Sequence, residues 1–222
     1  MMEIQKNILL FGPQGSGKGT QGERLAAHLG IPLIGTGALL RAESRKDTSR
    51  GKQLAEELET GNLVTESMTN AVLFDRLQEH DTEHGFLLDG YPRNQSQQDA
   101  FDVFLKTLRG GTVITRAIAL QLSDDQAIAR LSRRRVCGVC GAIYHTETMR
   151  PKTEGVCDAC GGEIIQRSDD TPEAIQRRLT IYHTETAPLL TRYEEQGILT
   201  RIDASGNIDD VFRRITYVLN LV

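Results

Sequence analysis

The chain lacks tryptophan and is poor in aromatic residues, which make up 5% of its 222 residues. Leucine, isoleucine, valine and alanine must therefore fill its interior. Because hydrophobic residues reach 39% and charged residues 25%, a packed core is feasible and wholesale disorder is excluded. At about 150 residues per domain, this length fits one compact domain with insertions better than two independent domains.

Long hydrophobic runs are also missing. No stretch approaches the roughly 20 apolar residues that a membrane helix needs, and the first run, residues 8–11, is too short for a secretory signal. We therefore expect no membrane partner and a cytoplasmic location. In that compartment the four cysteines are reduced, and their spacing points to a metal site instead of disulfides.

An excess of positive charge is absent as well. The 26 lysines and arginines face 30 acidic residues, which gives a net charge of −4. This balance argues against a protein that coats nucleic acid, so we expect no nucleic-acid partner. Any polyanion that the chain binds should be small and met by a local cluster of positive charge.

Short apolar runs alternate along the chain with longer amphipathic segments. Strands are expected at 8–11, 31–34, 85–88, 113–122 and 198–202. Helices are expected from the glycine-rich turn to residue 29 and at 66–77, 96–108, 124–133 and 172–195, the last capped by Thr171. This alternation predicts an α/β fold with a parallel sheet covered on both faces. Residues 35–64, with two small helices, and 134–167 break the alternation and predict two inserted subdomains.

A glycine-rich segment, GPQGSGKGT from Gly12 to Thr20, follows the first expected strand and opens the first helix. Closely spaced glycines let backbone N–H groups turn inward, and the helix N-terminus adds partial positive charge. Lys18 can then reach the outer phosphates of a nucleoside triphosphate. The alternative is a strand–helix turn that only happens to contain glycines. Gly19 stands where the general phosphate loop has Ser or Thr, and this GKGT form resembles nucleoside monophosphate kinases more than GTPases or motor ATPases.

The third expected strand ends in the run FLLDGYPR, which closes on Asp89 and Arg93. In open α/β sheets, ligands lie outside the carboxyl ends of the strands. Asp89 is therefore placed to orient Mg²⁺ through its waters, and Arg93 to grip a phosphate. The alternative is a turn whose polar groups cap the helix that begins near Asn94.

The four cysteines form two Cys-x2-Cys pairs with sixteen residues between the pairs: Cys137, Cys140, Cys157 and Cys160. This spacing is typical of a structural zinc site with four thiolate ligands, and bound metal can stabilise a segment too small for its own core. A full shell of sulfur leaves no position for water, so the metal should be architectural. We expect His145 to be exposed or hydrogen-bonded and not a ligand. Chance cysteines, a disulfide pair and iron in place of zinc are the alternatives.

Together with Thr36-Gly37, Arg41 and Leu63-Val64-Thr65, these motifs resemble the adenylate kinase family essentially end to end. The resemblance implies a P-loop core of residues 1–34, 65–132 and 171–222. It also implies an acceptor-nucleotide clamp at 35–64 and a mobile lid at 133–170, of the long zinc-binding type seen in bacterial members. The implied reaction is Mg·ATP + AMP ⇌ 2 ADP in a monomer.

The resemblance also implies site residues. Those at the transferring phosphoryl group are Lys18, Asp89, Arg93, Arg134, Arg167 and Arg178. Those at ATP are Gly15, Ser16, Gly17, Lys18, Gly19, Thr20, Arg130, Arg134, Ile143, Tyr144 and Gly206. Those at AMP are Thr36, Arg41, Asn62, Leu63, Val64, Gly90, Tyr91, Pro92, Arg93, Gln97, Arg167 and Arg178. Asp169 and Asp170 are expected to engage lid residues or arginines.

Two positions depart from the family pattern, Ala38 in place of an acidic residue and Gln14 in place of proline. The first removes a carboxylate near a helix start, and the second is expected to be harmless. A basic run such as residues 133–135 is, in isolation, typical of a solvated surface. Three rival functions stay open: a zinc-ribbon nucleic-acid binder with an ATPase core, a nucleotide-gated regulator without turnover, and a kinase specific for UMP/CMP or dependent on GTP.

Overall fold

The computed structural model describes residues 6–59, 64–167 and 170–219. Its centre is a parallel sheet of β1 (Lys6–Phe11), β2 (Leu33–Gly35), β3 (Gly85–Asp89), β4 (Arg116–Gln121) and β8 (Leu199–Asp203). The strand order is β2-β3-β1-β4-β8, so β1 lies in the middle of the sheet. Each of the five expected strands is present, and the predicted α/β fold class is confirmed.

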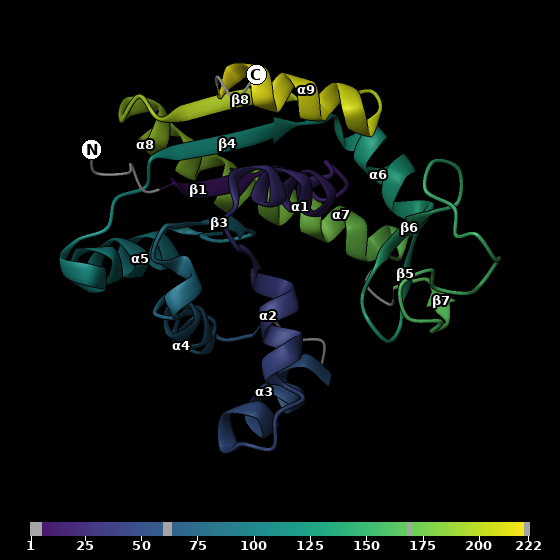
Figure 1. Cartoon of the computed structure of the whole chain (residues 1–222), viewed down its shortest axis with the longest axis horizontal. Coiled ribbons are helices and arrows are strands. Elements are labelled where there is room, and N and C mark those ends of the chain that lie inside the picture. The colour runs from purple at the N-terminus through teal and green to yellow at the C-terminus, as the bar shows by residue number, and fades with distance from the viewer. Residues whose placement is uncertain (1–5, 60–63, 168–169, 220–222) are drawn as a thin grey trace.

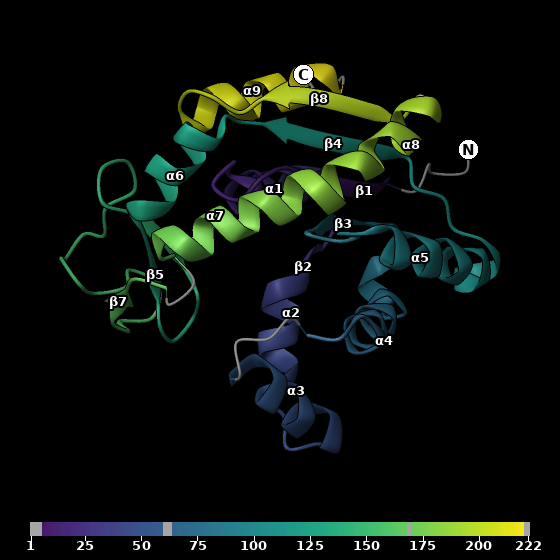
Figure 2. The same cartoon turned by 180° about the vertical axis from the view of Figure 1, so that it is seen from behind.

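Helices cover both faces of this sheet (Figures 1 and 2). The helices are α1 (Lys18–Leu29), α2 (Thr36–Glu43), α3 (Ser49–Glu59), α4 (Glu66–Leu77), α5 (Gln95–Thr107), α6 (Asp124–Ser132), α7 (Pro172–Ile181), α8 (Leu190–Glu195) and α9 (Ile208–Val218). Shorter turns are η1 (His80–Thr82), η2 (Leu108–Gly110), the π-helical η3 (Tyr182–Thr186) and η4 (Ala187–Leu189). The helix α9 was missed in the sequence.

Alternate residues of β1 face opposite sides of the sheet, as strand geometry requires. Leu9 and Phe11 pack with buried residues of α4, α5 and α8, whereas Ile8 and Leu10 pack with those of α1 and α9. All four side chains are buried. Burying one leucine or isoleucine is worth about 1.5–3 kcal/mol, so these two apolar layers hold the strands in their register.

Two segments extend from this core in both views (Figures 1 and 2). The first consists of α2 and α3, the two small helices expected between residues 35 and 64. The second carries a small antiparallel sheet of β5 (Arg134–Cys137), β6 (Ile143–His145) and β7 (Ile164–Ile165), in the order β6-β5-β7. The sequence did not predict these three strands, since they have only four, three and two residues in a segment rich in glycine and cysteine.

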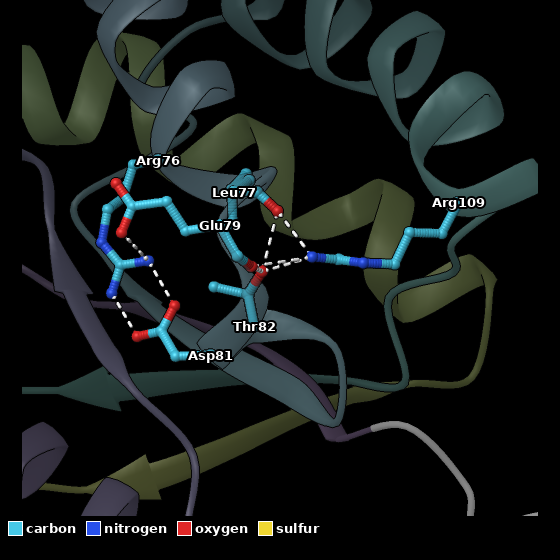
Figure 3. A network of polar contacts seen from close by, with 6 residues as sticks. All are labelled: Arg76, Leu77, Glu79, Asp81, Thr82 and Arg109. Carbon is cyan, nitrogen blue, oxygen red and sulfur yellow. Dashed lines mark hydrogen bonds and ion pairs between the residues drawn. The ribbon is translucent and has the colours of Figure 1, made fainter.

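The connection from α4 to β3 is held by polar contacts (Figure 3). A guanidinium nitrogen of Arg109 donates to the carbonyls of Leu77 and Glu79, at 3.1 and 3.0 Å, and to the hydroxyl of Thr82 at 2.7 Å. Carbonyls at a helix C-terminus lack intrahelical partners, so Arg109 satisfies groups that would otherwise need water. This network lies just before the amino end of β3, whereas Asp89 is the last residue at the strand's other end.

No helix among the described residues is both long and apolar enough to span a bilayer.

Candidate active site

The loop between β1 and α1 depends on glycine. Gly12, Gly15 and Gly17 have φ values of 150°, 82° and 89°, which other residues rarely adopt. A Cβ on Gly12 would lie 2.8 Å from the carbonyl oxygen of Leu120, and one on Gly15 would lie 2.8 Å from that of Ala127. The loop therefore closes tightly against the carboxyl end of β4 and against α6.

Lys18, the first residue of α1, points back into this loop. Its Nζ donates to the carbonyl oxygens of Gly12 at 2.6 Å and Pro13 at 2.9 Å. Burial lowers the pKa of Lys18 to about 8, although the nearby carboxylate of Asp89 opposes that shift. The ammonium thus lies at the centre of the loop, where phosphate oxygens could replace the two neutral carbonyls.

Further charged groups converge on Lys18 from other elements. The positive charges of Arg93, Arg178 and Arg134 each lower its pKa further. Burial raises the pKa of Asp89, and the charges of Lys18 and Arg93 act against that rise. Charged residues from the start of α1, the end of β3 and the turn after it, β5 and α7 therefore act on one another, and they include five of the six residues predicted at the transferring group.

The sixth, Arg167, is half-buried and precedes two residues outside the described part of the chain. Close to it, the buried carboxylate of Asp170 binds two other arginines. It accepts from Arg134 Nε at 2.8 Å and Nη2 at 2.5 Å, and Arg178 Nη1 lies 3.5 Å away. The sequence analysis expected Asp170 to engage arginines, and this is confirmed; Asp169 lies outside the described residues.

The turn after β3 is shaped by buried groups. Tyr91 is buried, and its hydroxyl donates to the carbonyl of Gln97 at 3.0 Å. Arg93 is exposed, and its Nε donates to the carbonyl of Gly90 at 2.8 Å. Tyr91 and the buried Pro92 therefore support the turn from inside, while the guanidinium of Arg93 stands at its surface.

The predicted acceptor side lies next to this turn. The Thr36 hydroxyl donates to the backbone carbonyl of Asp89 at 3.0 Å and so joins the start of α2 to the end of β3. Gln97 is buried, and its Oε1 accepts from the backbone N–H of Arg93 at 2.8 Å. Its Nε2 is the group that can donate to a base edge. Val64 is half-buried, whereas Asn62 and Leu63 lie outside the described residues.

The helix α2 begins without an acidic residue in its first turn, and its N-cap, Gly35, offers no side chain. Ala38 is exposed there, so the departure from the family pattern leaves no cavity to fill. The exposed Arg41 folds back along the helix, since a Cβ on Gly37 would lie 3.3 Å from its Nη1. The hydrogen bond of Thr36 anchors this end of α2.

On the other side of the phosphate loop, Arg130 bridges two segments. Its guanidinium donates to the carbonyls of Gly206 at 3.1 Å and Gly15 at 3.4 Å. From β6, the Cδ1 of Ile143 reaches within 3.4 Å of the position that a Cβ on Gly19 would take. Of the predicted ATP contacts, Arg130, Ile143 and Gly206 thus lie close to the loop and the start of α1.

Tyr144, another predicted ATP contact, turns its side chain into the lid. It is buried, and its hydroxyl donates to Cys157 Sγ at 3.4 Å and accepts from the backbone N–H of Asp158 at 2.7 Å. The hydrogen bond from Tyr144 lowers the pKa of Cys157 to about 6. The tyrosine therefore supports the thiolate form of Cys157, and only its backbone is left for a nucleotide.

The four cysteine sulfurs lie within 4.8 Å of one another. Cys137 Sγ is 3.5 Å from Cys160 Sγ, and Cys140 Sγ is 3.6 Å from Cys157 Sγ. A disulfide would need about 2.05 Å, whereas a tetrahedron with Zn–S bonds of about 2.3 Å has edges of roughly 3.8 Å. The four thiols are therefore spaced as a tetrahedral metal site requires.

The turns around these sulfurs have the form that metal-binding knuckles use. Gly141 and Gly161 follow the second cysteine of each pair with φ values of 78° and 73°, and their N–H groups bond the carbonyls of Cys137 and Cys157. His145 Nδ1 instead accepts from two backbone N–H groups at 3.2 and 3.3 Å. The expectation of a hydrogen-bonded His145 is confirmed.

Comparison with known proteins accords with this geometry. The family model described as adenylate kinase matches residues 10–198. This chain is 45% identical to a protein named adenylate kinase from Caldanaerobacter subterraneus subsp. tengcongensis, 44% to one from Streptomyces coelicolor and 43% to one from Methanosarcina barkeri. These alignments cover 96%, 93% and 96% of this chain and 95%, 95% and 98% of the relatives.

The chain belongs to the adenylate kinase family. It is a phosphotransferase of the nucleoside monophosphate kinase type, as the resemblance in its motifs implied. The rival interpretations as a nucleic-acid binder and as a regulator without turnover do not account for this relationship.

Two residues that hold the turn after β3 were not predicted from the sequence. Oδ1 of Asn70 in α4 lies 2.8 Å from the Tyr91 hydroxyl, whose single proton it shares with the Gln97 carbonyl. The buried Thr186 donates to the carbonyl of Arg93 at 2.7 Å. Neither residue stands in a motif, and each acts on a partner distant in sequence, so only the folded structure reveals them.

Proposed function

We propose that the protein reversibly transfers the terminal phosphoryl group of Mg·ATP to AMP and forms two ADP. Membership of the adenylate kinase family supports this reaction. The observation that carries it is that Asp89, Arg93, Arg134 and Arg178 lie near enough for their charges to act on the ammonium of Lys18. Such a cluster neutralises two polyanions that would otherwise repel each other.

We assign the donor nucleotide to the phosphate loop. Backbone groups of residues 15–20 and Lys18 would hold the phosphates, and Arg130, Ile143, Tyr144 and Gly206 would surround the base. The buried Ser16 hydroxyl has no hydrogen-bond partner among the described residues, and a phosphate oxygen would supply one. That orphaned oxygen favours a phosphate at this loop.

We assign the acceptor nucleotide to the opposite side, between α2 and the turn after β3. Thr36, Val64 and Gln97 would meet the adenine, while Arg41 and Arg93 hold the phosphate. Gln97 Nε2 suits the acceptor nitrogen of an adenine edge. The remaining assigned contacts are Asn62, Leu63, Gly90, Tyr91, Pro92, Arg167 and Arg178.

The acceptor phosphate needs no general base, because its second pKa is about 6 and it is already ionised near neutral pH. The protein's task is to align the two nucleotides and stabilise the transferring group with Lys18, Arg93, Arg134, Arg167 and Arg178. Mg²⁺ is a hard cation that takes oxygen ligands, and the Asp89 carboxylate beside Lys18 fits it. Bound with ATP, the ion supplies further neutralisation of phosphate charge.

The proposed architecture follows the predicted boundaries. Residues 1–34, 65–132 and 171–222 form the core, 35–64 the acceptor clamp and 133–170 the lid. Closing of the clamp and lid would exclude water and so prevent hydrolysis of ATP. One structural Zn²⁺ at the four cysteines would hold the lid's shape. We further propose a monomer in the cytoplasm, where reducing conditions keep those thiols able to bind metal.

The first test replaces Lys18 with alanine. We expect formation of ADP from ATP plus AMP to fall by at least about 100-fold, because the half-buried cation at the transferring group is lost. Lys106→Ala, an exposed lysine of α5, is the matched control and should keep wild-type turnover. A Lys18→Ala enzyme as active as that control would contradict the assignment. A panel of four nucleoside monophosphates with ATP and GTP then tests the preference for AMP and ATP.

A further inference from the structure

The proposal concerns a long helical path that covers the face of the sheet nearer the viewer in Figure 2. The path runs from the lid side through α7, η3 and η4 to α8 (Figure 2). It carries Arg178 in α7, beside the lid residue Asp170, and Thr186 two turns further along. One continuous helical path thus joins Arg178, which pairs with Asp170, to Thr186.

The path changes its winding in the middle. Residues of η3 form a π-helix, in which the N–H of Ala187 bonds the carbonyl of Tyr182 five residues earlier. Pro188 follows at once; it has no N–H, and its ring crowds the preceding turn, so a regular α-helix cannot continue through it. Wide π turns are rare and are frequent at functional sites. Here the wide turn ends at Thr186, whose side chain is buried.

Thr186 bonds the backbone of Arg93. Its hydroxyl donates to the Arg93 carbonyl at 2.7 Å, although 93 residues separate the two in sequence. On the other side of the same residue, the Arg93 N–H donates to Gln97 Oε1 at 2.8 Å. The backbone of Arg93 is therefore held at both ends, by α5 on one side and by the π turn on the other.

We propose that Thr186 is a positioning residue for phosphoryl transfer: it fixes Arg93 relative to Arg178 through the helical path that Thr186 and Arg178 share. The inference rests on the proposed function, in which both arginines stabilise the transferring group. Their charges already converge on Lys18. Because a shift of about 1 Å in such a group can cost up to roughly 100-fold in rate, a hydrogen bond to its backbone acts on catalysis without touching substrate.

The test compares Thr186→Val, which keeps the side chain's shape, with Thr186→Ser, which keeps its hydroxyl. Thr184→Val is the matched control, since Thr184 is an exposed residue of the same π turn whose hydroxyl bonds its own helix at Thr180. We expect Thr186→Val to lower kcat about tenfold and to leave KM for ATP within about twofold, while Thr186→Ser and Thr184→Val stay near wild type.

A second readout follows the Arg93 guanidinium itself. The Nε–H resonance of Arg93 should shift in Thr186→Val and stay in place in Thr184→Val. If Thr186→Val lowers thermal stability but leaves kcat and this resonance unchanged, the hydroxyl is merely structural and the proposal is overturned. Should valine prevent folding, serine against alanine at the same position makes the same comparison.

The two proposals can fail separately. A wild-type protein that forms no ADP from ATP and AMP would refute the proposed function alone, and the Arg93 resonance would still decide whether Thr186 positions it. Equal kcat in wild type and Thr186→Val, with ADP formed by both, would refute the positioning role alone.

Discussion

The two segments that extend from the sheet are stabilised in opposite ways. In the first, Leu40 of α2 and Leu54 of α3 pack with Val72 of α4, and all three are buried. In the lid, the corresponding cluster of buried residues is Cys137, Tyr144 and Cys157. The first segment thus shares a hydrophobic core with α4, whereas two of the three residues in the lid's cluster are thiols.

Ion pairs, by contrast, tie both segments to the core. Glu43 of α2 is buried and pairs with Lys46 at 2.6 Å and with Arg50 at 2.9 Å, and Arg50 also reaches Asp75 of α4 at 2.5 Å. Ion pairs therefore join the first segment to the core. In the lid, Asp170 likewise pairs with Arg178 of α7, but a segment this short cannot bury enough apolar surface to fold alone, so the lid needs another source of free energy. The spacing of its four sulfurs points to metal as that source.

Removing the metal should have the largest effect on activity, and it should unfold the lid while leaving α2 and α3 intact. We expect Cys157→Ser, or chelation of the purified protein, to unfold the lid and to reduce phosphoryl transfer by at least about 100-fold. The reason is that structural zinc contributes on the order of 10 kcal/mol in small domains, and the lid carries Arg134. Metal analysis should give one ion per chain in wild type, and amide exchange should rise in the lid but not in α2 and α3.

The control for this variant is Val139→Thr, which changes an exposed lid residue between Cys137 and Cys140. It should keep the metal and wild-type turnover. If the lid amides of Cys157→Ser stay protected from exchange after the metal is lost, metal binding at the four sulfurs does not stabilise the lid. The two segments would then not differ in the way argued above.

A cavity in the first segment should have the next largest effect. Leu54 is fully buried, so Leu54→Ala should lower the free energy of unfolding by about 2–5 kcal/mol and loosen α3. Gln53→Ala, at an exposed position of the same helix, should change it by less than about 0.5 kcal/mol. Urea unfolding with amide exchange measures both. Protection in α3 that survives Leu54→Ala would show that ion pairs, not apolar packing, hold this segment.

Much of the fold followed from sequence patterns. The helix at 66–77 has the predicted bounds because its apolar residues recur at helical spacing and are buried. The lid strands and α9 were missed: β7 has two residues, too few for any alternation to show, and α9 was overlooked although Asn207 caps it and Val211 and Ile215 recur at helical spacing. The order of strands in the sheet also depends on tertiary packing, which no local pattern encodes.

The candidate site likewise combines residues that local motifs predict with contacts that only the folded chain shows. The phosphate loop, the turn ending in Arg93 and the cysteine pairs are local motifs, so their residues could be read directly. Contacts across the chain could not be read: Arg130 bonds the carbonyl of Gly206, 76 residues away, and the Thr186 hydroxyl reaches Arg93. Their geometry follows from the packing of α6 and α7 and not from nearby residues.

The smallest predicted effect concerns pH and the ion pairs of the first segment. Hydrogen bonds from Lys46, opposed by burial and assisted by Arg50, hold the pKa of Glu43 below its usual 4.5. A carboxyl whose pKa is lowered on folding stabilises the protein above its unfolded pKa and loses that contribution as pH falls through its folded pKa. Glu43→Gln should therefore cost about 1–2 kcal/mol near neutral pH, and this difference from wild type should shrink below about pH 4.5. Urea unfolding of both proteins between pH 3 and 7 measures it, with the exposed Glu56→Gln of α3 as the control. A difference that stays constant across this range would mean that Glu43 stabilises α2 and α3 through packing and not through its ion pairs with Lys46 and Arg50.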